Sequence, residues 1–352
     1  MHNRWHPAIP AIQTISAGDL VTADLSDGLA GQIGADTSAA DLLSLDFTLT
    51  HPLTGPFWIE GAEPGDLVGV EIVDILPGAQ GFTFVIPGLG LLPELTGPFL
   101  VHWQLADGVA RSSELPGVEV AGHPFLGVVG VAPSEKQFAQ FRLREEDLAM
   151  RGGTVRMPDS RGAMPSGFAD PGLRTAPPRE NGGNLDFKGL GAGGRIWLPV
   201  EVDGGLLSLG DPHFAQGDGE SCGVAIEMAA TVTFRIQLRK APSWVPRSPV
   251  IEYASPARRD GGYLATTGIP VLESGENLEL DIRAAAQMAL RAMIDVLENV
   301  HGMSRMQAYV LASVAADLRI AEAVNPPNAL VVVQLPNDCL PHTSRDGGHR
   351  WP

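Results

Sequence analysis

The chain has 352 residues, of which 44% are hydrophobic and 18% charged, a composition typical of globular proteins and not of disordered or fibrous ones. Its net charge of −17 argues against nucleic-acid binding, because an acidic surface repels phosphate backbones. No apolar run reaches the roughly 18 residues of a membrane span, and the first residues lack a signal-peptide core, so we expect no membrane partner and a cytoplasmic location.

The many glycines and prolines indicate frequent turns, and most of the chain is accordingly predicted to be short strands. Residues 66–76 place their apolar side chains on one face of a strand. Residues 151–178 show no periodicity and form a long connection, either a lid over a site or a surface excursion. Residues 196–209 are predicted to be a hairpin that turns at residues 203–205. Residues 231–238 alternate between apolar and polar, as in a half-buried antiparallel strand.

Two helices are predicted near the C-terminus. Residues 282–300 carry an apolar stripe with three- and four-residue spacing, and a capping-box pattern at Ser304 begins a second helix whose stripe extends to Leu318. Residues 329–335 are predicted to be a buried strand. Together the elements predict a single domain over residues 1–352. Its fold class is α+β, predominantly β, with layered antiparallel sheets and a C-terminal helical pair packed on one face.

Two groups of polar residues flank the predicted hairpin. The first group is Glu180, Asn181, Asn184, Asp186 and Lys188. The second group is Asp211, His213, Gln216, Asp218, Glu220 and Cys222, followed by Glu227. Because the arms of a hairpin bring its two ends together, both groups are expected to meet at one end of a sheet. The pattern alone supports a functional site and ordinary turn chemistry equally.

Side chains of these types could together hydrolyse a resistant bond such as an amide, which needs an activated water, a stabilised oxyanion and a proton for the departing group. A metal held by carboxylates and one imidazole can meet the first two needs. Asp186, Asp211, His213 and Asp218 are the candidate ligands. The mixed nitrogen and oxygen set suits zinc, with calcium or magnesium as the harder alternatives.

A second route uses Cys222 as a nucleophile, with Glu180, Glu220 or Glu227 as the base and Lys188 to stabilise charge. Such a thiolate needs a lowered pKa, and nearby carboxylates act in the opposite direction. The metal route is therefore preferred, with a free glutamate carrying the proton. A buried, unreactive Cys222 is the plain structural alternative.

The same stretch resembles the acetamidase/formamidase family. The resemblance rests on PRENGGNLDFKGL at 178–190, GDPHFAQGDGE at 210–220 and CGVAIEM at 222–228. It extends over nearly the whole chain, through blocks at 3–10, 60–68, 123–134 and 308–330. The resemblance implies hydrolysis of short aliphatic amides to a carboxylate and ammonia by a β-rich, layered α+β subunit. It also implies a homo-oligomer, a dimer or higher, and a divalent metal, zinc first and calcium second.

Some alternatives stay open beside this resemblance. γ-Lactams and other cyclic amides are possible substrates, and a non-catalytic small-molecule binding protein is the alternative of another class. Asn184 and Gln216 are candidates for substrate binding, and so are His102 and His123, which could instead be structural. Residues 81–104 form a shorter, apolar version of the middle region of the family's formamidases. This region is expected to shape the pocket and leaves formamide specificity open.

Overall fold

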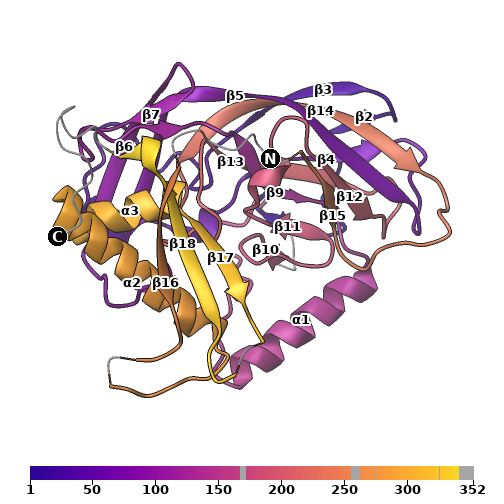
Figure 1. Cartoon of the computed structure of the whole chain (residues 1–352). Helices are drawn as coiled ribbons and strands as arrows, with labels where there is room; N and C mark the ends of the chain where they lie inside the picture. The colour runs from indigo at the N-terminus through magenta and orange to yellow at the C-terminus, as the bar shows by residue number, and fades with distance from the viewer. Residues whose placement is uncertain (167–171, 255–261, 273, 325, 341–352) are drawn as a thin grey trace.

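The computed structural model describes residues 1–166, 172–254, 262–272, 274–324 and 326–340. Antiparallel sheet dominates it, as predicted, and one sheet of 13 strands forms most of the body (Figure 1). The main path of this sheet contains β5 (Leu67–Val85), β6 (Phe99–Ala106), β7 (Val109–Arg111), β8 (Val120–Ala121), β9 (Phe125–Gly130), β11 (Gly182–Asn184), β13 (Leu207–His213) and β14 (Glu227–Arg239). The strands of this path lie in the order β11-β9-β13-β14-β5-β6-β7-β8.

Further strands join this sheet beside the main path. They are β2 (Gln13–Ile15), β3 (Leu20–Leu25), β4 (Leu53–Ile59), β12 (Arg195–Pro199) and β15 (Val250–Glu252). The pairing of β2 with β4 is parallel, and the other pairings of the sheet are antiparallel. The predicted strands at 66–76 and 231–238 lie within β5 and β14, which pair with each other. Their apolar faces form part of the core, where Val70, Val232 and Phe234 are fully buried.

The predicted hairpin over residues 196–209 is wrong. β12 pairs with β5 and β15, whereas β13 pairs with β9, β4 and β14. A turn does form around Gly204 and Gly205, which both have positive φ, but the chain leaves it toward another part of the sheet. Apolar alternation suits any neighbour with an apolar face, so it could not identify the partner of either strand.

The two polar groups nevertheless meet, because β9 lies between β11 and β13. Val128 of β9 is in register with Asn184 on one side and with Gly210 on the other. The end of β11 and the middle of β13 therefore lie on either side of the same residue. Members of both groups therefore converge, Asp186 from the first and Asp211 and His213 from the second, and the cause is a shared neighbour strand and not a hairpin.

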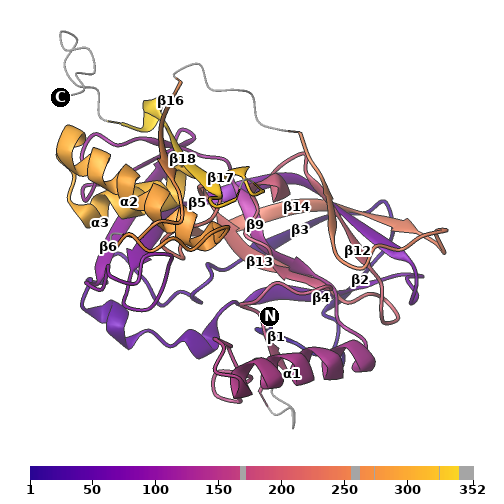
Figure 2. The ribbon, with the colours of Figure 1, turned by 60° about the horizontal axis from the view of Figure 1, so that its bottom comes forward.

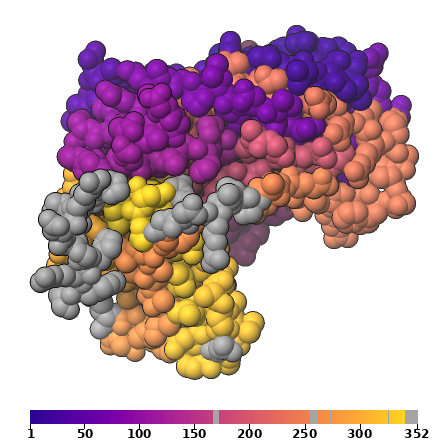
Figure 3. All heavy atoms as spheres, turned by 45° about the horizontal axis from the view of Figure 1, so that its top comes forward, coloured from indigo at the N-terminus to yellow at the C-terminus, as the bar shows by residue number. Residues whose placement is uncertain are grey.

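The C-terminal residues build a second layer. It contains α2 (Ile282–His301), α3 (Arg305–Ala315), β16 (Tyr263–Gly268), β17 (Asp317–Glu322) and β18 (Leu330–Pro336). The three strands form a sheet in the order β16-β18-β17, and α2 packs on it beside α3 (Figure 2). Close contact is possible because Gly268 has no side chain where the strand meets the backbone of Ala289. In Figure 3 these residues form a lobe that projects from the body.

The ends of the two helices follow the predicted local signals. Gly302 adopts the left-handed conformation as the C-cap of α2, and Ser304 and Gln307 form the capping box of α3. Leu318, however, is not part of the helical stripe, because α3 ends at Ala315 and the chain enters β17. The strand predicted at 329–335 is β18, with buried and half-buried positions alternating.

The remaining elements are one helix, a pair of two-residue strands and four short 3-10 turns. They are α1 (Glu135–Met150), the pair β1 (Arg4–Trp5) and β10 (Leu173–Arg174), and the 3-10 turns at Asp41–Ser44, Phe47–Leu49, Lys188–Leu190 and Asn337–Cys339. The connection predicted at 151–178 thus contains a short strand, and its residues 167–171 lie outside the described ones. In the described part of the chain, no helix combines the length and apolar character needed to cross a bilayer.

Candidate active site

Gly127 of β9 is the point at which the two polar groups come together. The amide nitrogens of Leu185 and Asp186 both donate to its carbonyl oxygen, at 2.8 and 3.2 Å. On the other side, β13 passes Gly127 between the register pairs that flank Asp211. A Cβ atom at Gly127 would lie 2.7 Å from Asp186 Oδ1 and 2.7 Å from Asp211 Oδ2. The missing side chain therefore lets the two carboxylates approach each other.

His213 and Glu227 complete the centre from the next pair of strands. They are register partners between β13 and β14, which places His213 Nε2 3.3 Å from Glu227 Oε1 and 3.5 Å from Asp211 Oδ2. Both residues are buried. The other ring nitrogen of His213, Nδ1, lies 3.0 Å from Gln216 Oε1. An Nδ1 proton donated to Gln216 would leave Nε2 as the nitrogen available to bind a cation held by the carboxylates.

Backbone strain is concentrated in the same place. Asp186, Asp211 and Glu220 have φ values of 44°, 56° and 40°, in the left-handed region that residues with a side chain rarely adopt. Such conformations persist where the surrounding structure holds them, and they cluster at functional sites. Here they direct three acidic side chains toward one imidazole.

These side chains are suited to hold a metal ion. Donor atoms of Asp186, Asp211 and His213 all lie within 4.8 Å of one another, and so do those of His213, Glu220 and Glu227. Asp186 Oδ1 and His213 Nε2 are buried without a hydrogen-bond partner among the described residues. Buried polar atoms normally have partners, so these atoms indicate a ligand. Glycine at position 28 adds to the fit, because a Cβ there would meet Asp211 and Glu227.

Without a cation, burial and mutual repulsion make it unfavourable for all of these carboxyl groups to be ionised, and several of their pKa values rise. Burial raises the pKa of Asp186 to about 8, with the Asp211 and Glu227 carboxylates adding to the shift and His213 opposing it. Burial also raises the pKa of Glu220, helped by Asp186, and that of Glu227. A bound divalent cation would favour the ionised carboxylates and reverse these shifts.

The imidazoles shift in opposite directions. Burial would lower the pKa of His213, but the charges of Glu227 and Asp211 raise it well above its ordinary value. Burial would likewise raise the pKa of Asp211, but the imidazoles of His51 and His213 outweigh it and lower the value. Burial lowers the pKa of His51 itself, and the nearby charge of Asp211 opposes this shift.

A cavity of about 500 Å³ opens beside this centre. Its acidic wall contains Asp186, Asp211, Glu220 and Glu227. The region predicted to shape the pocket contributes Phe84 and Leu89. The connection predicted as a lid or a surface excursion also lines the cavity, through Arg156, Met157, Asp159, Arg161, Arg174 and Ala176. The described part of that connection is therefore a wall of the cavity.

Asn184 and Gln216, predicted to bind substrate, contact the acidic centre through their side chains. Asn184 Nδ2 donates to Asp186 Oδ2 at 2.7 Å. Gln216 Nε2 donates to the carbonyl oxygen of Asp186 at 2.8 Å, while its Oε1 faces His213. Asn184 also lines the cavity. The contacts of Gln216 orient the candidate ligands.

Three other predicted residues lie apart from the acidic centre. Glu180 forms a two-pronged ion pair with Arg144 at 2.6 and 2.9 Å. Lys188 pairs with Asp317 and, at 3.3 Å, with Asp218. Asp218 belongs to neither group of candidate metal donors in the described structure. These residues were assigned to the site because they are close to Asp186 and Asp211 in sequence. In the structure, the chain turns their side chains toward other partners.

Cys222 is close in sequence to Glu220 but is fully buried in the apolar core. Its Sγ lies 3.4 Å from the Val224 carbonyl oxygen and 3.5 Å from that of Phe84. Burial raises the pKa of its thiol to about 12. An inaccessible, protonated thiol is a poor nucleophile, which argues against the cysteine route. Neither cysteine forms a disulfide in the described part of the chain.

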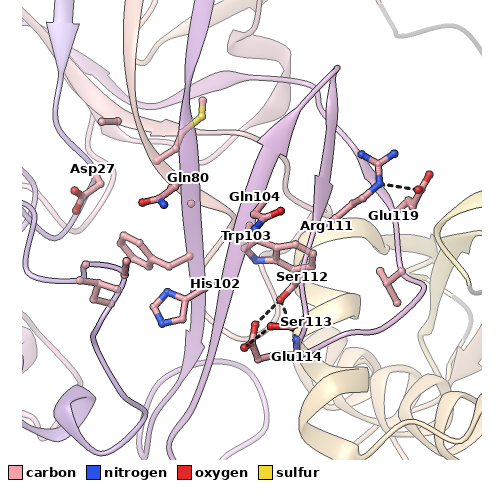
Figure 4. A pocket seen from close by; sticks show the side chains of 18 of the residues that line it. Asp27, Gln80, His102, Trp103, Gln104, Arg111, Ser112, Ser113, Glu114 and Glu119 are labelled. Carbon is pink, nitrogen blue, oxygen red and sulfur yellow. Dashed lines mark hydrogen bonds and ion pairs between the residues drawn. The ribbon is translucent and has the colours of Figure 1, made fainter.

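The two other predicted histidines lie in different cavities. His102 borders a separate cavity of about 1010 Å³, where its Nε2 lies 3.0 Å from the Thr37 carbonyl oxygen (Figure 4). His123 borders a third cavity of about 970 Å³, together with Lys188 and Gln216. Neither histidine lines the cavity beside the acidic centre.

Sequence reasoning missed His51, Gly28 and the arginines of the cavity wall. His51 Nε2 lies 4.0 Å from Asp211 Oδ2, and its Nδ1 is buried without a partner in the described structure. His51 and Gly28 lie far from Asp186 and Asp211 in sequence, and no local pattern marks them, whereas the arginines lie in the 151–178 connection that was singled out as a whole. Gly127, in contrast, lies in the 123–134 block of the family resemblance, so the sequence already marked this segment as one of interest.

Comparison with known proteins agrees with this geometry. Residues 1–341 match the model of the acetamidase/formamidase family. The formamidase of Methylophilus methylotrophus is 33% identical over 367 residues, covering 96% of this chain and 89% of the relative. The acetamidase of Mycolicibacterium smegmatis is 37% identical over 273 residues, covering 68% and 66%. The structure of a gamma lactamase from Delftia acidovorans superposes with a TM-score of 0.92 at 34% identity, covering 100% of this chain and 90% of that one. The chain belongs to the acetamidase/formamidase family.

Proposed function

We propose that this chain hydrolyses the carbon–nitrogen bond of a small non-peptide amide at the acidic centre of Asp186, Asp211, His213, Glu220 and Glu227. Membership of the family makes the chain an amidase. Two buried atoms that could bind a metal, Asp186 Oδ1 and His213 Nε2, have no hydrogen-bond partner among the described residues and support this location. They lie beside a cavity, where Gly127 lets the strands bring the carboxylates close together.

Asp186, Asp211 and His213 would hold a divalent metal, with zinc as the first expectation because carboxylate and imidazole donors suit it. When bound, such an ion supplies Lewis-acid chemistry at the amide carbonyl and the attacking water. Gln216 contributes by fixing the ring of His213 and the backbone of Asp186. Asp218, also predicted as a ligand, is left out of this set because it pairs with Lys188.

Glu220 and Glu227 are the candidates to carry protons. Both line the cavity, and burial raises the pKa of each, so each can hold a proton closer to neutral pH than an exposed glutamate. Glu227 Oε1 accepts from the Ala225 amide at 3.2 Å, which restricts its motion. We assign the transfer of a proton from water to the departing amine to Glu220, because Glu227 is held by His213 and this amide.

Cyclic amides are the second candidate class of substrate. The TM-score of 0.92 to a protein named as a gamma lactamase supports this class, and ring opening of a lactam breaks the same type of bond. Ammonia release separates the two classes, because a linear primary amide releases ammonia and a lactam yields an amino acid.

Metal analysis and turnover test the proposal together. The purified protein should contain a stoichiometric divalent metal, lose activity on chelation and regain it on adding that metal. Asp211→Asn, which keeps the size of the side chain, should lose both metal and turnover while remaining folded by circular dichroism. Full turnover in metal-free protein would refute the metal site, and full turnover in Asp211→Asn would refute the residue assignment.

We also propose that the chain acts as a homo-oligomer in the cytoplasm. Large apolar side chains on the outer face of α1 support a subunit contact, since Leu143 and Met150 are 66% and 80% exposed. Light scattering after size-exclusion chromatography measures the subunit number, and a monomeric mass would refute the oligomer.

A further inference from the structure

The cavity beside the acidic centre is larger than a short amide requires. Its volume is about 500 Å³, which at roughly 30 Å³ per molecule equals the liquid volume of on the order of 15 waters. Formamide or acetamide would occupy the space of only a few of these. The cavity therefore has room for further groups beyond the amide, and the lining side chains indicate which groups these are.

Arginines stand on the wall that the 151–178 connection provides. Arg156, Arg161 and Arg174 all line the cavity. Asp159 forms an ion pair of 2.6 Å with Arg161. Arg156, an exposed residue at the cavity, forms no ion pair with any residue that the structure describes. Arg174 is buried, with 6% exposure, and its guanidinium donates to the Phe47 carbonyl and to Thr50 Oγ1.

Arg156 and Arg174 line the same cavity and carry like charges. Burial lowers the pKa of Arg174 and the charge of Arg156 adds to this shift, whereas the charges of Asp159 and Asp46 oppose it. Neither guanidinium forms an ion pair within the described residues, and an anion in the cavity would stabilise both charges. The overall net charge of −17 makes this local positive charge more notable, because the rest of the surface repels anions.

The acidic part of the lining sets the orientation of such a ligand. Asp186, Asp211, Glu220 and Glu227 would repel an anionic group, whereas a neutral amide can approach them. The other lining side chains are largely apolar and include Leu29, Phe47, Phe84, Leu89, Met157 and Val224. They suit a short hydrocarbon spacer.

We infer that the substrate is an amide that carries a carboxylate on a short aliphatic spacer, with the carboxylate bound by Arg156 beside the buried charge of Arg174. This inference depends on the proposed function for the position of the amide. It adds a substrate class, the ω-carboxy amides, and a residue that selects it.

The experiment compares matched pairs of amides. Succinamate and glutaramate are assayed by ammonia release against butyramide and pentanamide, which lack the carboxylate. Arg156→Met should lower kcat/KM for the two carboxylates by about 10- to 100-fold, the range for a lost hydrogen bond to a charged group, and should leave the alkyl amides within about twofold. Arg156→Lys should retain part of the preference. Arg247→Met removes the same charge at an exposed position outside the described cavities and should change nothing.

A binding measurement separates this inference from the proposed function. Calorimetry with glutarate and pentanoate, which differ by one carboxylate, should show a preference for glutarate that Arg156→Met removes. Arg156-dependent binding without turnover of any amide would overturn the proposed function and keep the anion subsite. Turnover of alkyl amides at least as efficient as that of their carboxylated partners, unchanged by Arg156→Met, would overturn the subsite and keep the proposed function.

Discussion

Replacing Gly127 with alanine would place a methyl group against both carboxylates of the proposed metal site. The new Cβ would lie 2.7 Å from Asp186 Oδ1 and from Asp211 Oδ2, whereas ordinary contacts begin at 3.4 Å. Each carboxylate must therefore retreat by about 0.7 Å or turn away. The backbone of Gly127 is not in the left-handed region, so alanine itself introduces no strain there.

The expected loss of turnover is about 100-fold, the typical result of displacing catalytic groups by roughly 1 Å. The free energy of unfolding should fall by only about 1–3 kcal/mol, as for other overpacked sites. Ammonia release, metal content after dialysis and urea unfolding measure these effects. Gly34→Ala is the matched control, since a Cβ there meets nothing within 4 Å. Wild-type turnover and metal content in Gly127→Ala would refute the role of the two carboxylates.

Three further changes probe other parts of the structure. Gln216→Ala should lower metal affinity about 10- to 100-fold by releasing the ring of His213, with activity recovered at excess metal, and chelator competition measures this. Cys222→Ala should keep turnover within about twofold while losing on the order of 1 kcal/mol of stability, and an inactive but folded variant would restore the nucleophile hypothesis. Burial lowers the pKa of His2 to about 4, so between pH 6.5 and 4 only the unfolded chain takes up this proton. The free energy of unfolding should therefore fall by about 2–3 kcal/mol as the pH drops through that window. His2→Gln should remove this part of the slope in urea unfolding at pH 7 and 4.5, and an unchanged slope would contradict the assignment.

The sequence by itself determined the features that depend on near neighbours in the chain. The alternation along residues 231–238 predicted the buried face of β14, and the Ser304 pattern predicted the start of α3. Asp186, Asp211 and His213 were identified as candidate ligands from their residue types and the family motifs, and the structure brings their donor atoms together. Such signals are local, because periodicity and capping depend on residues a few positions apart.

Only the tertiary structure decided which strands are neighbours and which polar side chains share a site. β9 inserts between β11 and β13, so two segments that were predicted to meet through a hairpin meet through a third strand. The same folding turns Lys188 toward Asp317 and brings His51 and Arg156 to the cavity from other parts of the chain. Strand pairing uses backbone hydrogen bonds common to all residues, so the choice of partner depends on packing across the whole sheet.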